Sequence, residues 1–408
     1  MTARASELRL AREEGGRIGR LFAVWLPAIW IFALGLTGCR PHDFPQYPPN
    51  YREYAYVTNG GSGTVSVLDV VNVRLDREVA VGLNPVAVAA SPTRNEIYVV
   101  DSGTAEGQGA VAILNAEKNT VAGYIPVHRL PVFIETSVDG NVAWVANSGS
   151  NNISVLDLKT RREVARIGTG EEPVEARVAP DGKTLVVPNR RGNSVTLIDP
   201  AAYRVRAVFE GCPGASDAVI LPDSSKAFIA CGAGHQVMAI ALAHAGQPDR
   251  METLMDVGLA PVQLALKPDG GELFVSNSMS DSISEVVTTT DDVGGAYLMG
   301  DSPVRGIVTG DNSWLYVSNV RSQEVTMYAI DDGKRAGGIH VGDGPSAMAF
   351  SAEGHLLFVV DTRSGDVAVV RTAAAQAGSG GGPSHGLFTM LPTGRGPNAI
   401  AVKGFKVP

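Results

Sequence analysis

Tyr56-Val57-Thr58-Asn59 is a four-residue phrase that returns seven more times along the chain. The later copies share an apolar pair and a polar or small final residue: Tyr98-Val99-Val100-Asp101, Trp144-Val145-Ala146-Asn147, Val186-Val187-Pro188-Asn189, Phe228-Ile229-Ala230-Cys231, Phe274-Val275-Ser276-Asn277, Tyr316-Val317-Ser318-Asn319 and Phe358-Val359-Val360-Asp361. The fourth residues of successive copies are 42, 46, 42, 42, 46, 42 and 42 residues apart. A period this regular is typical of repeat architectures, in which each repeat forms one structural unit.

Three other phrases accompany each copy in a fixed order. A Gly/Pro corner such as residues 170–173 precedes an apolar run, and a turn such as Pro180-Asp181-Gly182 precedes the repeated phrase. A polar loop then leads to a run ending in an acid (152–157), which is followed by an alternating stretch (163–167). The alternation of apolar residues favours strands over helices. Each repeat is therefore predicted to be a meander of four short antiparallel strands separated by tight turns.

With this pattern the chain resembles the YVTN-repeat β-propeller family, as a bacterial lipoprotein member, over residues 55–402. The resemblance implies an all-β propeller of four-stranded antiparallel blades, in which each sheet covers its neighbour. Seven blades are common in the family and are the alternative to the eight expected here. The Gly/Pro corner occurs eight times, at Pro85, Pro131, Pro173, Pro213, Pro261, Pro303, Pro345 and Pro397.

The order of the phrases also predicts how the ring closes. By analogy with WD-repeat propellers, the run after each corner forms the innermost strand of its blade. The chain then starts on a second strand (55–59) and ends on a first strand (398–402). We expect the C-terminal strand to pair with the N-terminal blade, because this closure removes the open sheet edge.

The N-terminal region has the features of an export signal. Arg17 and Arg20 precede an apolar run (21–36), and Leu36-Thr37-Gly38-Cys39 resembles a lipobox, in which Cys39 carries the lipid. An uncleaved membrane anchor is the alternative, although the run is shorter than a span of roughly 20 residues. The predicted segments are a lipoprotein signal peptide (1–38), a proline-rich tether (39–54) and the propeller (55–404). The protein is expected in the cell envelope, attached to the membrane through Cys39, with the propeller facing the periplasm or the cell exterior.

Charge and cysteine content narrow the classes of partner. The chain has 34 Lys and Arg against 42 Asp and Glu, a formal net charge of −8, so no nucleic-acid partner is expected. Cys212 and Cys231 fall at the same end of neighbouring strands and are candidates for a disulfide in an oxidising compartment. Two separate thiols packed as small apolar groups are the alternative. No Cys-x-x-Cys-His motif is present, so covalent c-type haem is not expected.

The candidate ligand-binding residues lie in loops that share one face of a propeller, called here the funnel face. These loops enter the innermost strands or leave the second strands. Guanidinium groups around the channel mouth can hold a carboxylate or phosphate bidentately, which points to an anionic small-molecule ligand. The alternative is that they pair with Glu171, Glu172 and Asp217 as solvated loop charges. The candidates are the Arg and His side chains of these loops: His128, Arg129, Arg190, Arg191, His235, Arg305, Arg321, Arg363 and Arg395.

Residues that recur in most blades are interpreted as scaffold. The strand-ending Asn59, Asn147, Asn189, Asn277 and Asn319 are expected to bond the following loop as Asx turns do. A nucleophile elbow, a phosphate loop and a zinc-binding spacing are absent from the sequence. No catalytic or metal-binding residue is therefore predicted.

The leading hypothesis for function is an exported binding or scaffold module for a protein, peptide or small ligand, with no cofactor. The alternative is a propeller enzyme or cofactor carrier that uses the same funnel. Quinoprotein dehydrogenases resemble the architecture but carry adjacent cysteines and repeated tryptophans, and this chain lacks both, so a quinone has little support. The haem d1 domain of nitrite reductase also resembles the repeat, with His128 or His235 as an axial ligand. Lactonase-like propellers are the third enzyme alternative.

Overall fold

The computed structural model describes residues 47–243, 246–372 and 386–407. The predicted signal peptide, Cys39 and most of the predicted tether lie outside these ranges. Every secondary-structure element named within these ranges is a β-strand. Among these residues, no helix is long and apolar enough to span a membrane.

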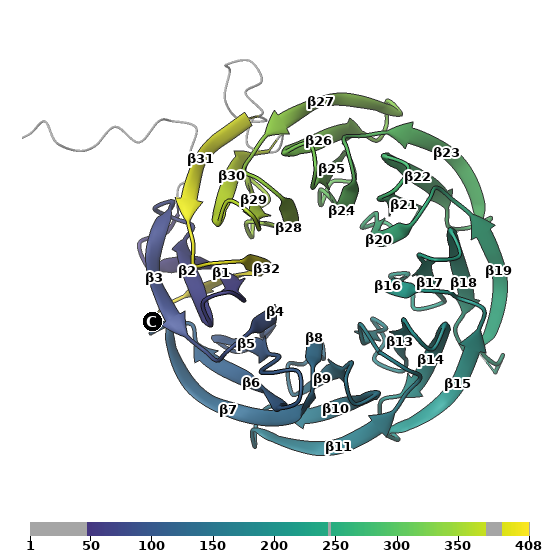
Figure 1. The fold of residues 1–408 in the computed structure, drawn as a ribbon, viewed down its shortest axis with the longest axis horizontal. Helices are drawn as coiled ribbons and strands as arrows, with labels where there is room; N and C mark the ends of the chain where they lie inside the picture. Colours follow the sequence, from purple (N-terminus) through teal and green to yellow (C-terminus); the bar gives the residue numbers. More distant parts are fainter. Residues whose placement is uncertain (1–46, 244–245, 373–385, 408) are drawn as a thin grey trace, which may run out of the picture. The chain divides into compact units, whose positions relative to one another are not determined.

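The strands form eight four-stranded antiparallel sheets, the blades, arranged in a ring (Figure 1). The innermost strands line a central channel. The innermost strands of blades 1 to 8 are β32 (Pro397–Lys406), β4 (Pro85–Ala90), β8 (Pro131–Thr136), β12 (Arg177–Val178), β16 (Ala215–Ile220), β20 (Pro261–Leu266), β24 (Pro303–Val308) and β28 (Pro345–Phe350). The second strands contain the repeated phrase: β1 (Tyr51–Asn59), β5 (Glu96–Asp101), β9 (Val142–Asn147), β13 (Leu185–Asn189), β17 (Lys226–Cys231), β21 (Glu272–Asn277), β25 (Trp314–Asn319) and β29 (Leu356–Asp361).

Two further strands complete each blade on its outer side. The third strands are β2 (Thr64–Asp69), β6 (Gln108–Asn115), β10 (Asn152–Asp157), β14 (Ser194–Asp199), β18 (Gln236–Ala241), β22 (Ser282–Val287), β26 (Glu324–Ala329) and β30 (Asp366–Arg371). The outermost strands are β3 (Arg74–Ala80), β7 (Thr120–Arg129), β11 (Arg162–Gly168), β15 (Arg204–Glu210), β19 (Arg250–Asp256), β23 (Asp292–Leu298), β27 (Lys334–His340) and β31 (Gly386–Pro392). The eight-bladed propeller is therefore confirmed, and the seven-bladed alternative is wrong.

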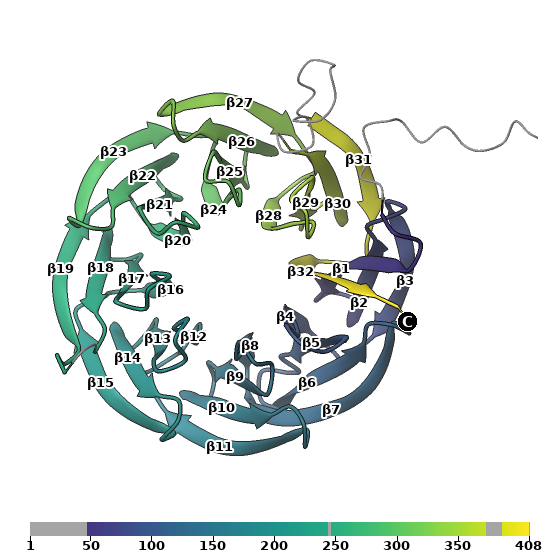
Figure 2. The same cartoon turned by 180° about the vertical axis from the view of Figure 1, so that it is seen from behind.

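The ring closes through the first and last strands of the chain, which lie side by side in both views (Figures 1 and 2). Ala55 pairs with Val402 and Val57 with Ile400, which is the register that Val99 and Val88 have in blade 2. The paired region is longer than expected, because Tyr51 also pairs with Lys406. Residues 51–54 therefore belong to β1 instead of the tether, and the last blade strand continues beyond residue 404.

The hydrophobic core lies between the faces of neighbouring blades. Between blades 2 and 3, for example, Tyr98 and Ile113 pack against Val145 and Leu156, and all four side chains are fully buried. This arrangement follows from the period of two in a strand, which directs alternate side chains to opposite faces. Because each inner strand is apolar on both faces, every blade can contribute to two such clusters.

The repeated asparagines have a different role from the one predicted. In some blades their Nδ2 groups donate to the first residue of the third strand, as Asn147 does to Asn152 Oδ1 at 2.9 Å. Their shared partner, however, is a hydroxyl on the third strand, seven residues further along the chain. The Nδ2-to-hydroxyl distances lie between 2.8 and 3.0 Å for the pairs Asn59–Ser66, Asn147–Ser154, Asn189–Thr196, Asn277–Ser284 and Asn319–Thr326. The asparagine thus joins the second and third strands of its own blade, instead of forming an Asx turn.

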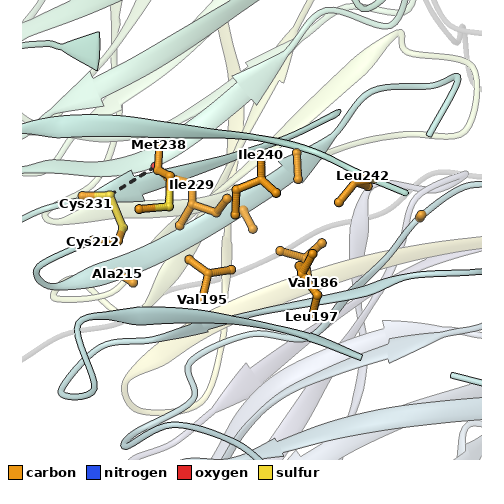
Figure 3. Close-up of a cluster of buried hydrophobic side chains, with 13 residues drawn as sticks. Val186, Val195, Leu197, Cys212, Ala215, Ile229, Cys231, Met238, Ile240 and Leu242 are labelled. Atoms are coloured by element: carbon orange, nitrogen blue, oxygen red, sulfur yellow. Dashed lines mark hydrogen bonds between the residues drawn. A yellow bond between two sulfur atoms is a disulfide. The ribbon is translucent and has the colours of Figure 1, made fainter. Parts of the chain in front are cut away.

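Cys212 and Cys231 form a disulfide, with their Cα atoms 4.8 Å apart. Cys231 ends β17 and pairs with Ala215, so Cys212 lies just before the start of β16. Both cysteines are fully buried in the cluster between blades 4 and 5, beside Val195 and Met238 (Figure 3). The bond therefore ties the innermost strand of blade 5 to the second strand within an apolar environment.

Candidate binding site in the central channel

The central channel contains a cavity of about 490 Å³, called here the central cavity, which is lined by residues of the innermost strands. In each innermost strand, the residue that pairs with the third residue of the repeated phrase is called here the third position. Ala87, which pairs with Val100, is an example. The fifth position lies two residues further along the same strand. The third and fifth positions share one face of the innermost strand, because alternate residues of a strand point the same way. Polar residues occupy the third position in blades 4 to 7: Glu175, Asp217, Gln263 and Arg305. Apolar residues occupy it in blades 8, 1, 2 and 3: Ala347, Ala399, Ala87 and Phe133.

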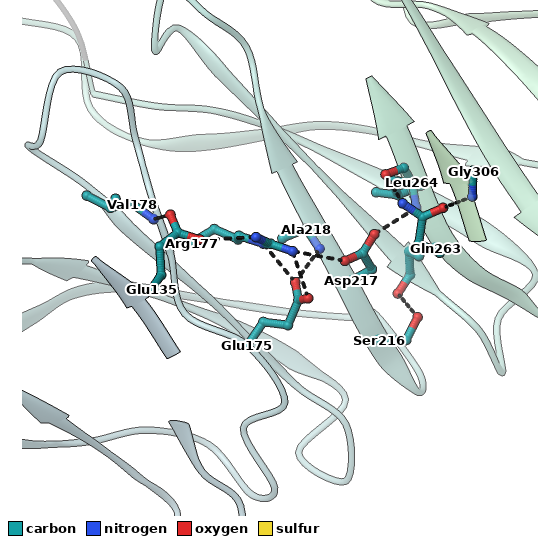
Figure 4. Close-up of polar contacts among 11 residues, drawn as sticks. Glu135, Glu175, Arg177, Val178, Ser216, Asp217, Ala218, Gln263, Leu264 and Gly306 are labelled. Carbon is teal, nitrogen blue, oxygen red and sulfur yellow. Dashed lines mark hydrogen bonds and ion pairs between the residues drawn. The ribbon is translucent and has the colours of Figure 1, made fainter. Parts of the chain in front are cut away.

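An ionic cluster occupies the polar side of the channel (Figure 4). The guanidinium of Arg177, at the fifth position of blade 4, bonds both carboxylate oxygens of Glu175 at 3.1 and 3.3 Å. It also lies 3.1 Å from Glu135 Oε2 and 3.9 Å from Asp217 Oδ1. The same guanidinium stacks 4.7 Å above the ring of Phe133. One cation is thus shared by three carboxyl groups from three consecutive blades.

Electrostatics single out Glu175 within this cluster. Its side chain is buried, and burial raises the pKa of its carboxyl above the usual range. The neighbouring Arg177 opposes this shift, whereas the nearby Asp217 carboxyl adds to it. Because the cluster has more carboxyl groups than cations, Glu175 is the group best placed to hold a proton near neutral pH.

The polar third positions also join successive blades. Glu175 Oε2 accepts the N–H of Ala218 at 3.1 Å, and Asp217 Oδ2 accepts the N–H of Leu264 at 2.7 Å. Gln263 Oε1 accepts the N–H of Gly306 at 2.6 Å. Each innermost strand has one edge without a partner strand, so these side chains satisfy donors that would otherwise be unpaired. Blades 4 to 7 are therefore connected through the channel wall.

Most of the predicted funnel-face arginines are paired in exposed loops. Arg190 and Arg191 both contact Glu172, at 3.2 and 3.8 Å. Arg321 lies 3.9 Å from Asp301, and Arg363 lies 3.0 Å from Asp343. Arg190 and Arg191 thus pair with one of the acids named in the alternative, whereas Arg321 and Arg363 pair with acids that the alternative did not include.

The other predicted residues divide into two groups. Arg129 and Arg395 are exposed, and the guanidinium of Arg129 reaches the carbonyl of Ala105 at 3.5 Å. Arg305 lines the central cavity, as does Arg190. Among the residues that the structure describes, no carboxylate forms an ion pair with Arg305. Of the two predicted arginines that line the cavity, Arg190 is paired with Glu172, so Arg305 is the one available to a ligand there.

The two candidate histidines do not face the central cavity. His128 Nε2 lies 2.9 Å from Glu163 Oε1, and His235 Nδ1 accepts the N–H of Ala260 at 3.1 Å. No histidine lines the cavity, and within the described ranges no cluster of His, Cys, Asp or Glu can hold a metal ion. These positions do not fit axial ligands for a haem in the channel.

The ionic cluster was not recognised from the sequence. Its signal is visible in Val174-Glu175-Ala176-Arg177, where charged residues stand at both the third and the fifth positions of one innermost strand. Both Glu175 and Arg177 line the central cavity. The prediction of an apolar run after the corner at residues 170–173 is wrong at Glu175 and Arg177.

Comparisons with known proteins agree with this architecture. A family model described as YNCE-like beta-propeller matches residues 110–364. No curated protein matches the chain.

Solved structures share the fold at low sequence identity. AztD from Citrobacter koseri is 12% identical with a TM-score of 0.64, over 88% of this chain and 99% of that one. The periplasmic gluconolactonase PpgL of Pseudomonas aeruginosa is 17% identical with a TM-score of 0.58, over 88% and 99%. Hydrazine synthase of Kuenenia stuttgartiensis is 22% identical with a TM-score of 0.54, over 67% and 91%. These likenesses concern the fold alone, whereas the family match covers more than half of the sequence. The chain belongs to the YNCE-like β-propeller family.

Proposed function

We propose that this protein is an exported, lipid-anchored propeller that binds a small ligand in its central cavity. The observation that carries the proposal is the cavity itself. Its volume of about 490 Å³ lies within the range of small-molecule sites, and its lining combines alanines with a few charged groups. A closed ring holds these side chains in place, so the ligand meets a site that is formed before it binds.

A cavity-filling variant tests this function. Phe133 shows that the third position accepts an aromatic ring, so Ala399→Phe is expected to fill part of the cavity while the propeller folds. Thermal-shift screening of a metabolite library should find compounds that stabilise the wild type but not the variant. Val138→Phe, at a side chain that is 71% exposed, is the matched control and should respond like the wild type. If every stabilising compound acts equally on all three proteins, the cavity is not the site.

Export and lipidation are proposed from the residue pattern at Leu36–Cys39, which lies outside the described ranges. Lipid on Cys39 would attach the protein to a membrane, with residues 40–50 linking it to the propeller. Cys39→Ser should move the protein from the membrane fraction to the soluble fraction. If the variant stays with the membrane, the apolar run acts as an anchor.

Lactone hydrolysis is a second candidate, supported by the protonatable Glu175 in the cavity. In this reaction water adds to the ester carbonyl, the ring C–O bond breaks, and the departing oxygen takes up a proton. Glu175 would donate that proton. PpgL, a gluconolactonase, shares the fold. Hydrolysis of glucono-δ-lactone, followed by acid release, should exceed the spontaneous rate and fall in Glu175→Gln. A rate equal to that of buffer alone eliminates this candidate.

A further inference from the structure

The register of the innermost strands fixes where their backbone donors point. Ala218, Leu264 and Gly306 pair with the second residue of the repeated phrase in their blades, at Ile229, Val275 and Val317. Their N–H groups leave the sheet and are accepted by a side chain from the preceding blade. In an antiparallel strand the N–H and C=O of one residue point to the same edge. Residues at the same register position in other blades therefore direct both groups towards the channel.

In four consecutive blades, no side chain of the described residues accepts the N–H group at this register position. The corresponding residues are Met348, Ile400, Val88 and Ile134, each paired with the second residue of its phrase. Within the described ranges, no side chain accepts any of these four N–H groups. All four residues line the central cavity.

The third-position side chains of the preceding blades explain why no side chain accepts these four N–H groups. The third positions of blades 7, 8, 1 and 2 hold Arg305, Ala347, Ala399 and Ala87, where blades 4 to 6 hold Glu, Asp and Gln. An alanine cannot accept a hydrogen bond, and it leaves the space that a capping side chain would fill. Arginine donates instead of accepting. Blades 8, 1 and 2 thus have room and donors without a carboxylate at these positions, whereas Ile134 of blade 3 is followed by Glu135, which also lines the cavity.

Charge on the two sides of the channel is correspondingly different. Arg305 lines the cavity and has no carboxylate partner among the described residues. The fifth positions of blades 7, 8, 1 and 2 are Ile307, Ala349, Ala401 and Ala89, so they add no negative charge. The carboxyl groups of Glu135, Glu175 and Asp217 lie on blades 3 to 5 around Arg177.

We propose that the central cavity binds a small hydroxylated organic anion, whose carboxylate or phosphate pairs with Arg305 and whose other oxygens accept the N–H groups of Met348, Ile400, Val88 and Ile134; these five groups are called here the donor arc. Backbone N–H groups and a guanidinium together form strong, charge-assisted hydrogen bonds to oxyanions. The C=O groups of the same four residues point to the same edge and accept hydrogen bonds from ligand hydroxyls. The inference rests on the proposed function, because it names the ligand class of the central cavity.

Isothermal titration of the soluble Cys39→Ser protein with D-gluconate, inorganic phosphate and D-glucose tests the ligand class. Gluconate has both an anionic group and hydroxyls, and it should bind more tightly than either phosphate or glucose. Glucose binding as tightly as gluconate would show that the charge is not recognised, and would overturn the donor arc.

Two variants test the site. Ala347→Gln places in blade 8 the side chain with which Gln263 caps Gly306, so it should cap Ile400 and lower gluconate affinity about tenfold or more. Because it adds a hydrogen bond, it should leave the melting temperature unchanged or raise it. Arg305→Gln should also lower the affinity about tenfold or more, since a charged donor is lost. Arg166→Gln, on the outermost strand of blade 3, removes the same charge from an exposed position and should bind as the wild type does.

The outcomes separate this inference from the function on which it rests. If gluconate binds Ala347→Gln and Arg305→Gln as tightly as the wild type, the donor arc is not its site. If neutral library compounds bind in the cavity while neither anion does, the donor arc fails and the binding function stands. If no compound distinguishes the wild type from Ala399→Phe, both fail.

Discussion

Asp361 occupies the position where five other blades carry asparagine, and its carboxyl is fully buried at the end of β29. Oδ2 accepts the N–H of Gly342 at 3.0 Å, but among the described residues Oδ1 has no hydrogen-bond partner. Burial raises the pKa of Asp361 to about 8, and the nearby Asp366 adds to the shift. The folded protein therefore binds more protons than the unfolded chain between about pH 4 and pH 8. This group's contribution to stability falls as the pH rises through that window.

We predict that Asp361→Asn raises the free energy of unfolding by ~1–3 kcal/mol at pH 8 and has little effect at pH 4. Urea titrations at the two pH values measure the difference. Asp101→Asn is the control at the equivalent position of blade 2. Asp101 Oδ1 accepts the N–H groups of Leu83, Asn84 and Gly103, so losing its charge should destabilise the fold. An Asp361→Asn variant that is less stable than the wild type at pH 8 would contradict the assignment.

At the scale of single residues, the sequence showed where the repeated asparagines lie but not which groups they bond. The repeated asparagine was visible, but its bond to a hydroxyl seven residues further on was not, because the interaction crosses a strand pair whose register had to be known. The pattern was nevertheless present, since Ser66, Ser154 and Thr196 each follow an asparagine at that spacing. Blade 5, with Cys231 in place of asparagine, has Met238 in place of the hydroxyl.

At the scale of elements, the disulfide joins the segment just before β16 to the end of β17, across a sequence separation of 19 residues. Closing a loop of that length lowers the entropy of the unfolded chain, and such a bond typically contributes ~2–4 kcal/mol. We predict that reduction with dithiothreitol lowers the free energy of unfolding by this amount, as measured by urea titration of the Cys39→Ser protein. The double variant Cys212→Ala, Cys231→Ala should be equally destabilised and should not respond to dithiothreitol. A wild-type titration that is identical with and without reductant would show that the bond is not formed or not stabilising.

The strands themselves were predictable, because each has its own turn signals and its own alternation. Two features could not be predicted from the sequence. The extension of β1 to Tyr51 depends on its pairing with Lys406, and a tether rich in proline gives no local sign of it. The ionic cluster depends on which innermost-strand residues come into contact between blades. Glu135 Oε1, for example, accepts the N–H of Val178 in the next blade at 3.0 Å. Contacts between repeats are set by the assembled ring and not by any single repeat.

At the scale of the whole molecule, stability depends on closing a ring whose first and last strands lie at opposite ends of the sequence. β32 supplies the innermost strand of blade 1, and Thr58 Oγ1 bonds Asn398 Oδ1 at 2.5 Å. Blade 1 in turn contacts blade 8, where Glu53 Oε1 accepts the N–H of Ala352 at 2.7 Å. We predict that deleting residues 397–408 exposes the edge of β1 and lowers the melting temperature by more than ~10 °C.

Complementation distinguishes this effect from a general loss of folding. A synthetic peptide of residues 397–408, added in excess to the truncated protein, should pair with β1 and restore much of the lost melting temperature, because binding to the folded state stabilises it. A peptide in which Ile400 is replaced by aspartate is the matched control, since this side chain packs against the apolar cluster shared by blades 1 and 8. Equal rescue by both peptides, or normal stability of the truncated protein, would mean that the ring does not depend on its closing strand.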